Sequence, residues 1–359
     1  MLNPGIDETK QIDARSMIKE KSESSWLMRY KPVLKLAIGI VVLVFLVITI
    51  RKATLDVLEH RDHLDFRAMD WRWLFAGVIA YAIGMMPAAA AWLQTLRAFG
   101  QSVPFWAGMH AYFLGHLGKY VPGKAMVIVL RVGKLAPLGI EIKPTIVSIF
   151  VETLTSVAVG AVVGCLFIFL GPEFPPGWLV LGAAICVPCS ILLLLPHTFR
   201  ALLAILAKSR IGRMPRSVSE AFTWRMMLRT CAWMALGWLI HGTAAWLVLS
   251  GIQPTPLVLS GIQPTPLVLS GIQPTPSLWT VHAWTSCVAA VSLGSVVGFA
   301  SMLPGGAVIR ELVITWLLSH IVPQPIALLA AIAFRVANLL AEFLVVGGIS
   351  LVKGKAATR

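Results

Sequence analysis

The chain alternates between long apolar runs and short polar segments, and the lengths of the runs predict membrane-spanning helices. A helix rises 1.5 Å per residue, so about 20 apolar residues are needed to cross a hydrocarbon core roughly 30 Å thick. We expect spans at residues 33–50, 71–96, 145–170, 178–195, 227–249, 278–302, 307–322 and 326–352. The pattern predicts an all-α integral membrane protein with about eight transmembrane helices.

Two apolar stretches are broken by glycine, proline and charge. The first is residues 115–124, Gly-His-Leu-Gly-Lys-Tyr-Val-Pro-Gly-Lys, within the run 105–132. We expect that run to form a re-entrant broken-helix segment. The second is residues 303–311, Leu-Pro-Gly-Gly-Ala-Val-Ile-Arg-Glu. Broken backbone is tolerated at membrane depth only where protein or a polar cavity surrounds it. One break in each half of the chain indicates a transport site and an inverted pseudo-repeat.

The polar segments divide the chain into parts. Residues 1–32 are basic and predict a cytoplasmic tail, residues 33–352 form the transmembrane domain, and residues 353–359 form a second basic tail. The decapeptide Leu-Val-Leu-Ser-Gly-Ile-Gln-Pro-Thr-Pro occurs three times in succession over residues 247–276. Its repeated Pro-Thr-Pro prevents a continuous helix, so we expect an expanded external loop.

Composition supports a polytopic protein, because 57% of the residues are hydrophobic and only 13% are charged. The formal net charge is +14, and Lys and Arg gather in the segment 196–226 and near both ends. By the positive-inside rule, these parts face the cytoplasm, so we expect a multi-pass cell-membrane (cytoplasmic-membrane) protein with both termini inside. Without a soluble basic face, the charge does not predict nucleic-acid binding.

The first break carries cations beside a point where a helix restarts. Such a start offers free backbone amides to an anion, and neighbouring cations favour a phosphate group. We predict that Lys119, Tyr120 and Lys124 bind a lipid headgroup, with Pro122 and Gly123 as a helix-break hinge. The alternative is that these cations only anchor a re-entrant loop at the inner interface.

The second break repeats this arrangement. Pro304, Gly305 and Gly306 interrupt the chain and provide a second hinge. Arg310 follows in the first turns of the next helix and is a further candidate for the headgroup phosphate. Glu311 either favours that helix N-terminus or neutralises Arg310.

Four more polar residues interrupt the apolar spans. Glu152 lies near the start of one span, and Arg335, Asn338 and Glu342 share one face of the last span at spacings of three and four. A charge at the centre of a membrane helix costs roughly 2.5–3.5 kcal/mol, so each needs a partner or a cavity. On the last helix, Arg335 and Glu342 align and pair through Asn338 in the simplest arrangement. A salt-bridge network and a polar translocation path both fit these residues.

Metal, cofactor and catalytic motifs are absent from this sequence. It contains no Walker loop, GxGxxG, HExxH or GxSxG. His60 and His63 are too few to predict a metal site. Cys186 and Cys189 match C-x-x-C without the βαβ context of a redox site. We expect no catalytic residue, cofactor or metal.

The two breaks, with Glu152 in the span that follows the first, resemble those of the lysylphosphatidylglycerol synthase transmembrane (flippase-like) family. The resemblance covers residues 33–352. It implies a polytopic protein, and the best-understood branch moves aminoacylated phosphatidylglycerol across the cytoplasmic membrane. Other branches are linked to hopanoid lipids or polyprenyl-linked sugars. The chain lacks the soluble acyltransferase-like domain, so we expect no synthase activity. The second break lacks a further Gly that relatives often have before the Arg.

We therefore predict a flippase-like protein that moves a lipid or lipid-linked anion between leaflets. Its partners would be anionic phospholipid, polyprenyl-linked or hopanoid lipid, and a separate lipid-modifying enzyme is a further candidate. The alternatives are a membrane glycosyl- or aminoacyl-transferase with Glu152 or Glu311 as base, and a non-transporting partner of a synthase. The sequence names neither the lipid, the energy source nor the oligomeric state.

Overall fold

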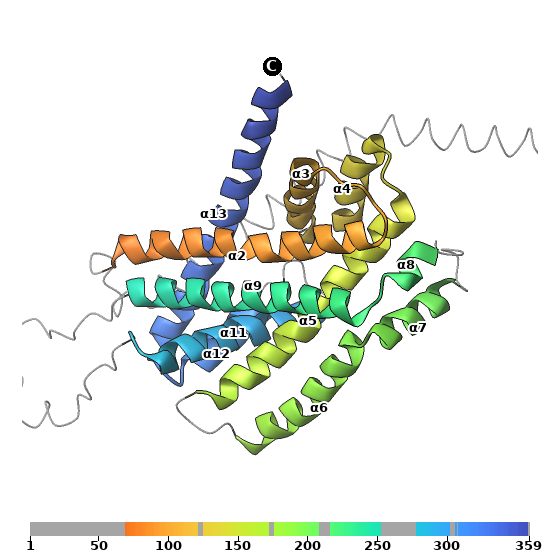
Figure 1. Ribbon diagram of the computed structural model, residues 1–359. Helices are drawn as coiled ribbons and strands as arrows, with labels where there is room; N and C mark the ends of the chain where they lie inside the picture. The colour runs from red at the N-terminus through yellow and green to blue at the C-terminus, as the bar shows by residue number, and fades with distance from the viewer. Residues whose placement is uncertain are drawn as a thin grey trace, which may run out of the picture. The chain divides into compact units, whose positions relative to one another are not determined.

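The computed structural model describes residues 69–120, 125–171, 176–207, 216–252, 278–301, 306 and 308–357, and in these ranges all regular structure is helical (Figure 1). The elements are α2 (Trp71–Ala98), α3 (Phe105–His116), η3 (Leu117–Tyr120), α4 (Ala125–Leu135), η4 (Ala136–Leu138), α5 (Ile142–Phe169), α6 (Gly177–Leu194), α7 (Pro196–Ala207), α8 (Arg216–Glu220), α9 (Trp224–Gly251), α11 (Val281–Ala300), α12 (Ile309–Leu318) and α13 (Gln324–Ala357).

Six of these helices are long and apolar enough to cross a membrane, which confirms the all-α membrane fold. They are α2, α5, α6, α9, α11 and α13, and each corresponds to a predicted span. Polar caps mark several starts: Asp70 accepts from Arg72 N–H at 3.0 Å, and Thr223 and Thr280 cap α9 and α11 in the same way. Such caps satisfy backbone donors that have no partner inside the helix.

The remaining predicted segments have different outcomes. The first predicted span, residues 33–50, and the decapeptide copies beyond residue 252 lie outside the described residues. The span expected at 307–322 is shorter in the structure, because α12 covers only Ile309–Leu318. Its ten residues extend about 15 Å, half the hydrocarbon thickness. Positive φ angles at Gly306 and Val308 prevent an earlier start.

The run 105–132 folds as predicted into an interrupted helix. α3 leads into the short helix η3, and α4 returns against α3. The hairpin packs against α13 through α3 and against α5 through α4. It therefore brings the first break of the sequence against the last long helix.

The centre of the bundle is the pair α2 and α9, which lie side by side in Figure 1. α11 packs between α9 and α5, and α13 packs across α2. Small residues allow these close approaches. Gly242 on α9 lies so near α11 that a Cβ would come within 2.6 Å of Val288 Cα.

We expect Gly242→Ala to destabilise the protein by about 1–3 kcal/mol, because an added methyl group forces two packed helices apart. Unfolding in mixed detergent micelles measures the effect. Gly182→Ala on α6 is the matched control, since a Cβ there meets nothing within 4 Å. Equal stability of the two variants would contradict the close packing of α9 on α11.

Several polar side chains lie well inside the spans, away from the helix ends. Tyr81 and Glu152 each lie ten residues after the first residue of their helices, and His241 lies ten residues before the end of α9. Ten residues of helix extend about 15 Å. Polar groups inside membrane spans mark functional sites by default.

Candidate functional site

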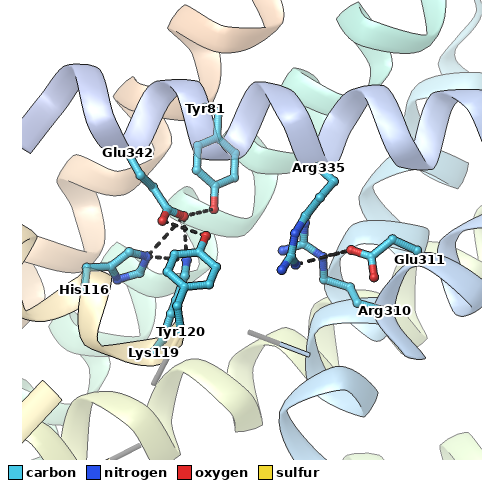
Figure 2. Close-up of polar contacts among 8 residues, drawn as sticks. All are labelled: Tyr81, His116, Lys119, Tyr120, Arg310, Glu311, Arg335 and Glu342. Atoms are coloured by element: carbon cyan, nitrogen blue, oxygen red, sulfur yellow. Dashed lines mark hydrogen bonds and ion pairs between the residues drawn. The ribbon is translucent and has the colours of Figure 1, made fainter. Parts of the chain in front are cut away.

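Glu342 on α13 is surrounded by polar side chains from three other elements (Figure 2). Lys119 Nζ lies 2.5 Å from Glu342 Oε1, and the Tyr120 hydroxyl donates to Oε2 at 2.8 Å. The Tyr81 hydroxyl from α2 donates to Oε1 at 3.4 Å. His116 Nε2 lies 3.7 Å from the same oxygen. These five residues form the Glu342 cage. Its charges balance, because one ammonium faces one carboxylate.

The histidine of the cage has a protonation state that follows from its neighbours. His116 Nε2 lies 2.8 Å from Lys119 Nζ. An ammonium group can only donate, so Nε2 must accept from it and the imidazole is neutral in this arrangement. Lys119 is thereby held by an acceptor on each side.

A second group of charges surrounds Glu311 on α12. Arg335 Nη1 lies 3.3 Å from Glu311 Oε1, and Arg310 Nε lies 3.5 Å from the same atom. Oε2 of Glu311 accepts from the Val308 N–H at 2.8 Å. With the Asn338 amide oriented by its hydrogen-bond network, its oxygen accepts from Arg310 Nη2 at 2.7 Å. We call Arg310 and Arg335 the arginine pair.

The guanidinium groups of Arg310 and Arg335 both contact the carboxylate of Glu311. Arg310 also lies in the first turn of α12, where the helix dipole adds partial positive charge. The potential at this point therefore favours an anion.

The break before α12 places Arg310 where it is. Gly306 has φ 65° and Val308 has φ 71°, a left-handed conformation that a β-branched residue rarely adopts. Gly298 on α11 lets Gly306 and Arg310 approach, since a Cβ there would lie 3.1 Å from Arg310 Cβ. Oε2 of Glu311 accepts a hydrogen bond from the backbone N–H of Val308. Glu311 thus contacts both the backbone at the start of α12 and the side chain of Arg310.

The cage and the arginine pair are neighbours. The ring centroid of Tyr120 lies 5.8 Å from Arg335 Cζ, and that of Phe334 lies 5.9 Å from Arg310 Cζ. Figure 2 shows Glu342 and Arg335 descending from one helix, with Tyr120 beneath and between them. The result is one polar region built from α2, α3, η3, α12 and α13.

Glu152 belongs to a different cluster. It forms an ion pair with Arg131 of α4 and accepts from the Tyr112 hydroxyl at 3.0 Å. Arg131 Cζ also lies 4.3 Å from the Tyr112 ring centroid and 4.6 Å from that of Trp92. Aromatic rings and carboxylate thus enclose the guanidinium. This cluster fastens the hairpin to α5 and α2.

The structure shows where most of the predicted site residues lie. It brings Lys119, Tyr120, Arg310, Glu311, Arg335, Asn338 and Glu342 into one region. The pairing of Arg335 with Glu342 through Asn338 is replaced by bonds to other elements, since Lys119 contacts Glu342 and Glu311 contacts Arg335. Gly306 lies at the second break. The other predicted residues, Lys124, Pro122, Gly123, Pro304 and Gly305, lie outside the described residues.

Sequence reasoning missed Tyr81, Tyr112 and His116. Tyr81 and His116 contact Glu342, and Tyr112 contacts Glu152. A signal was available, because the chain has 4 Tyr against 15 Phe and 13 Trp. A hydroxyl in an apolar helix needs an acceptor, and Tyr81, Tyr112 and Tyr120 all bond a buried carboxylate.

Comparison with protein families gives one match to the chain. The model of the lysylphosphatidylglycerol synthase TM region matches residues 32–282. The match includes the hairpin and Glu152 and ends before α12 and α13. Comparison with curated proteins gives no match.

Proposed function

Because the chain belongs to the lysylphosphatidylglycerol synthase TM region family, we propose that it moves a lipid or lipid-linked anion between membrane leaflets. Family and spans make it a multi-pass membrane protein related to lipid handling. The step from lipid handling to translocation is supported by one observation above all: Arg310 lies in the first turn of α12, and its Nε is buried without a hydrogen-bond partner among the described residues.

An anion would find suitable donors beside Arg310. A helix start offers free backbone amides to an anion, and a buried polar group in a membrane protein marks a functional site by default. Arg310 and Arg335 offer forked donors suited to phosphate oxygens. A headgroup phosphate would be held there on its way between leaflets.

The hairpin would deliver the headgroup to the arginine pair. Lys119 and Tyr120 lie at the end of η3, beside Arg335. The two breaks, at residues 115–124 and 303–311, would act as hinges between rigid helices, as broken helices do in transporters. In this proposal Lys124, Pro122, Gly123, Pro304 and Gly305 keep the roles that the sequence suggests.

The proposal also includes location and partners. The distribution of Lys and Arg supports a location in the cell membrane, with both termini and residues 196–226 in the cytoplasm. Anionic phospholipid, polyprenyl-linked lipid and hopanoid lipid are the candidate substrates. A separate lipid-modifying enzyme would supply a modified lipid.

A leaflet-resolved assay in liposomes tests the function. The full chain is reconstituted with labelled aminoacyl-phosphatidylglycerol, a polyprenyl-phosphate sugar or a plain phospholipid. Faster exchange of one of these lipids than in protein-free liposomes supports translocation and identifies its substrate class. No acceleration of any lipid by folded protein would overturn the proposal and favour a transferase or a partner of a synthase.

We expect Arg310→Gln to slow transport by on the order of 30-fold or more, since losing one partner of a buried charge pair costs about 2 kcal/mol at least. Glu311 keeps Arg335 as its partner, so the variant should fold. Arg229→Gln is the matched control, because Arg229 is an exposed arginine on α9. Equal transport by the two variants would remove Arg310 from the path.

A further inference from the structure

The polar groups around Glu342 come from elements other than its own. Tyr81 belongs to α2, His116 to α3, and Lys119 and Tyr120 to η3, while Glu342 belongs to α13. Their polar atoms converge on one carboxylate at 2.5 to 3.7 Å. Without Glu342, the same atoms would surround an empty position beside a lysine ammonium. Two hydroxyls and an ammonium are the donors that phosphate oxygens accept from.

We propose that Tyr81, His116, Lys119 and Tyr120 form an oxyanion-binding site, which the carboxylate of Glu342 occupies as an internal competitor. The ligand is a phosphate group, which brings several acceptor oxygens and negative charge as the carboxylate does. When the phosphate binds, Glu342 withdraws with α13 and the donors exchange one anion for another.

Two side chains of the cage are partly exposed. The side chains of Lys119 and His116 are 25% and 26% exposed, whereas that of Glu342 is 1% exposed. The Arg131–Glu152 pair differs, because its side chains are 2% and 11% exposed and aromatic rings enclose the guanidinium. A closed pair suits a structural link, and an open cage suits exchange of its anion.

The cage also adjoins the arginine pair. Tyr120 belongs to the cage and its ring faces Arg335 at 5.8 Å. A phosphate leaving the cage would meet the guanidinium next, so the two sites form consecutive positions. This inference rests on the proposed function for the lipid nature of the ligand, whereas the site itself requires only phosphate chemistry.

A binding experiment tests the site without transport. The full chain is purified in a nonionic sugar detergent, which contains no phosphate, and titrated with short-chain phosphatidylglycerol or with inorganic phosphate. We expect Glu342→Gln to bind phosphatidylglycerol at least tenfold more tightly than the wild type, because the competing charge is gone. Glu141→Gln is the control, since Glu141 is exposed. Tighter binding of phosphatidylglycerol alone identifies a lipid headgroup site, and tighter binding of both probes identifies a site for any phosphate.

Two further variants separate competition from a structural role. Glu342→Asp keeps the charge but shortens the side chain by one methylene. It should also bind phosphatidylglycerol more tightly than the wild type, and it serves as the test if Glu342→Gln fails to fold. Adding Lys119→Met to Glu342→Gln should remove the gain in affinity for phosphatidylglycerol. Unchanged or weaker binding by folded Glu342→Gln or Glu342→Asp would overturn the proposal.

The outcomes for site and function are distinguishable. A gain in binding without any lipid exchange in liposomes would support the site and contradict translocation. Lipid exchange by the wild type, without tighter phosphate binding by Glu342→Gln, would support translocation and contradict the site.

Discussion

Replacing Arg131 by methionine is expected to destabilise the protein by about 3–5 kcal/mol, the usual cost of removing one partner of a buried ion pair. Arg131 is 2% exposed and pairs with Glu152. Among the described residues, its loss leaves the Glu152 carboxylate with the Tyr112 hydroxyl at 3.0 Å as its hydrogen-bond donor. The aromatic contacts of the guanidinium with Trp92 and Tyr112 are lost as well.

Unfolding in mixed detergent micelles measures this effect. Lys134→Met is the matched control on the same helix, because Lys134 is exposed. Adding Glu152→Leu to Arg131→Met should recover part of the loss, since no charge then remains buried and unpaired. If Arg131→Met is as stable as Lys134→Met, the cluster does not hold the hairpin.

Gly118→Val is expected to disrupt the hairpin and to abolish transport. A Cβ at Gly118 would lie 2.7 Å from Val127 N and 2.9 Å from Met126 C. These are backbone atoms of α4, so no rotation of a side chain relieves the clash. η3 must move away from α4, at a cost of about 1–3 kcal/mol or more. Lys119 and Tyr120 follow Gly118 directly and would leave Glu342.

The matched control is Gly133→Val, on α4 of the same hairpin. A Cβ at Gly133 meets nothing within 4 Å, so this variant carries the same change in helix propensity without the clash. The two variants are compared by unfolding in micelles and by lipid exchange in liposomes. We expect only Gly118→Val to lose transport. Retention of transport by Gly118→Val would show that the position of η3 does not matter.

The family match gives the two halves of the site different support. Residues 32–282 match the family, and they include Tyr81, His116, Lys119 and Tyr120. Arg310, Glu311, Arg335 and Glu342 lie beyond the match and are placed by the structure. The proposed function therefore depends on contacts between a matched hairpin and an unmatched pair of helices.

The sequence by itself determined the membrane fold and the location of the first break. Both depend on short-range properties: the length of an apolar run decides whether a helix crosses a membrane, and Pro or Gly interrupts it locally. The same reasoning identified Lys119, Arg310, Arg335 and Glu342 as charges that need partners. It overestimated α12, because the left-handed backbone at Val308 is not encoded in hydrophobicity.

Only the tertiary structure decided which charge meets which. Spacing along α13 favoured a link between Arg335 and Glu342, yet Glu342 contacts Lys119, 223 residues away, and Tyr81, 261 residues away. The sequence could not rank these pairs, since the energy of a buried ion pair depends on distance and desolvation after packing. Packing of α13 against α2 and α3 brings Tyr81 and Lys119 to the carboxylate, and this contact defines the cage.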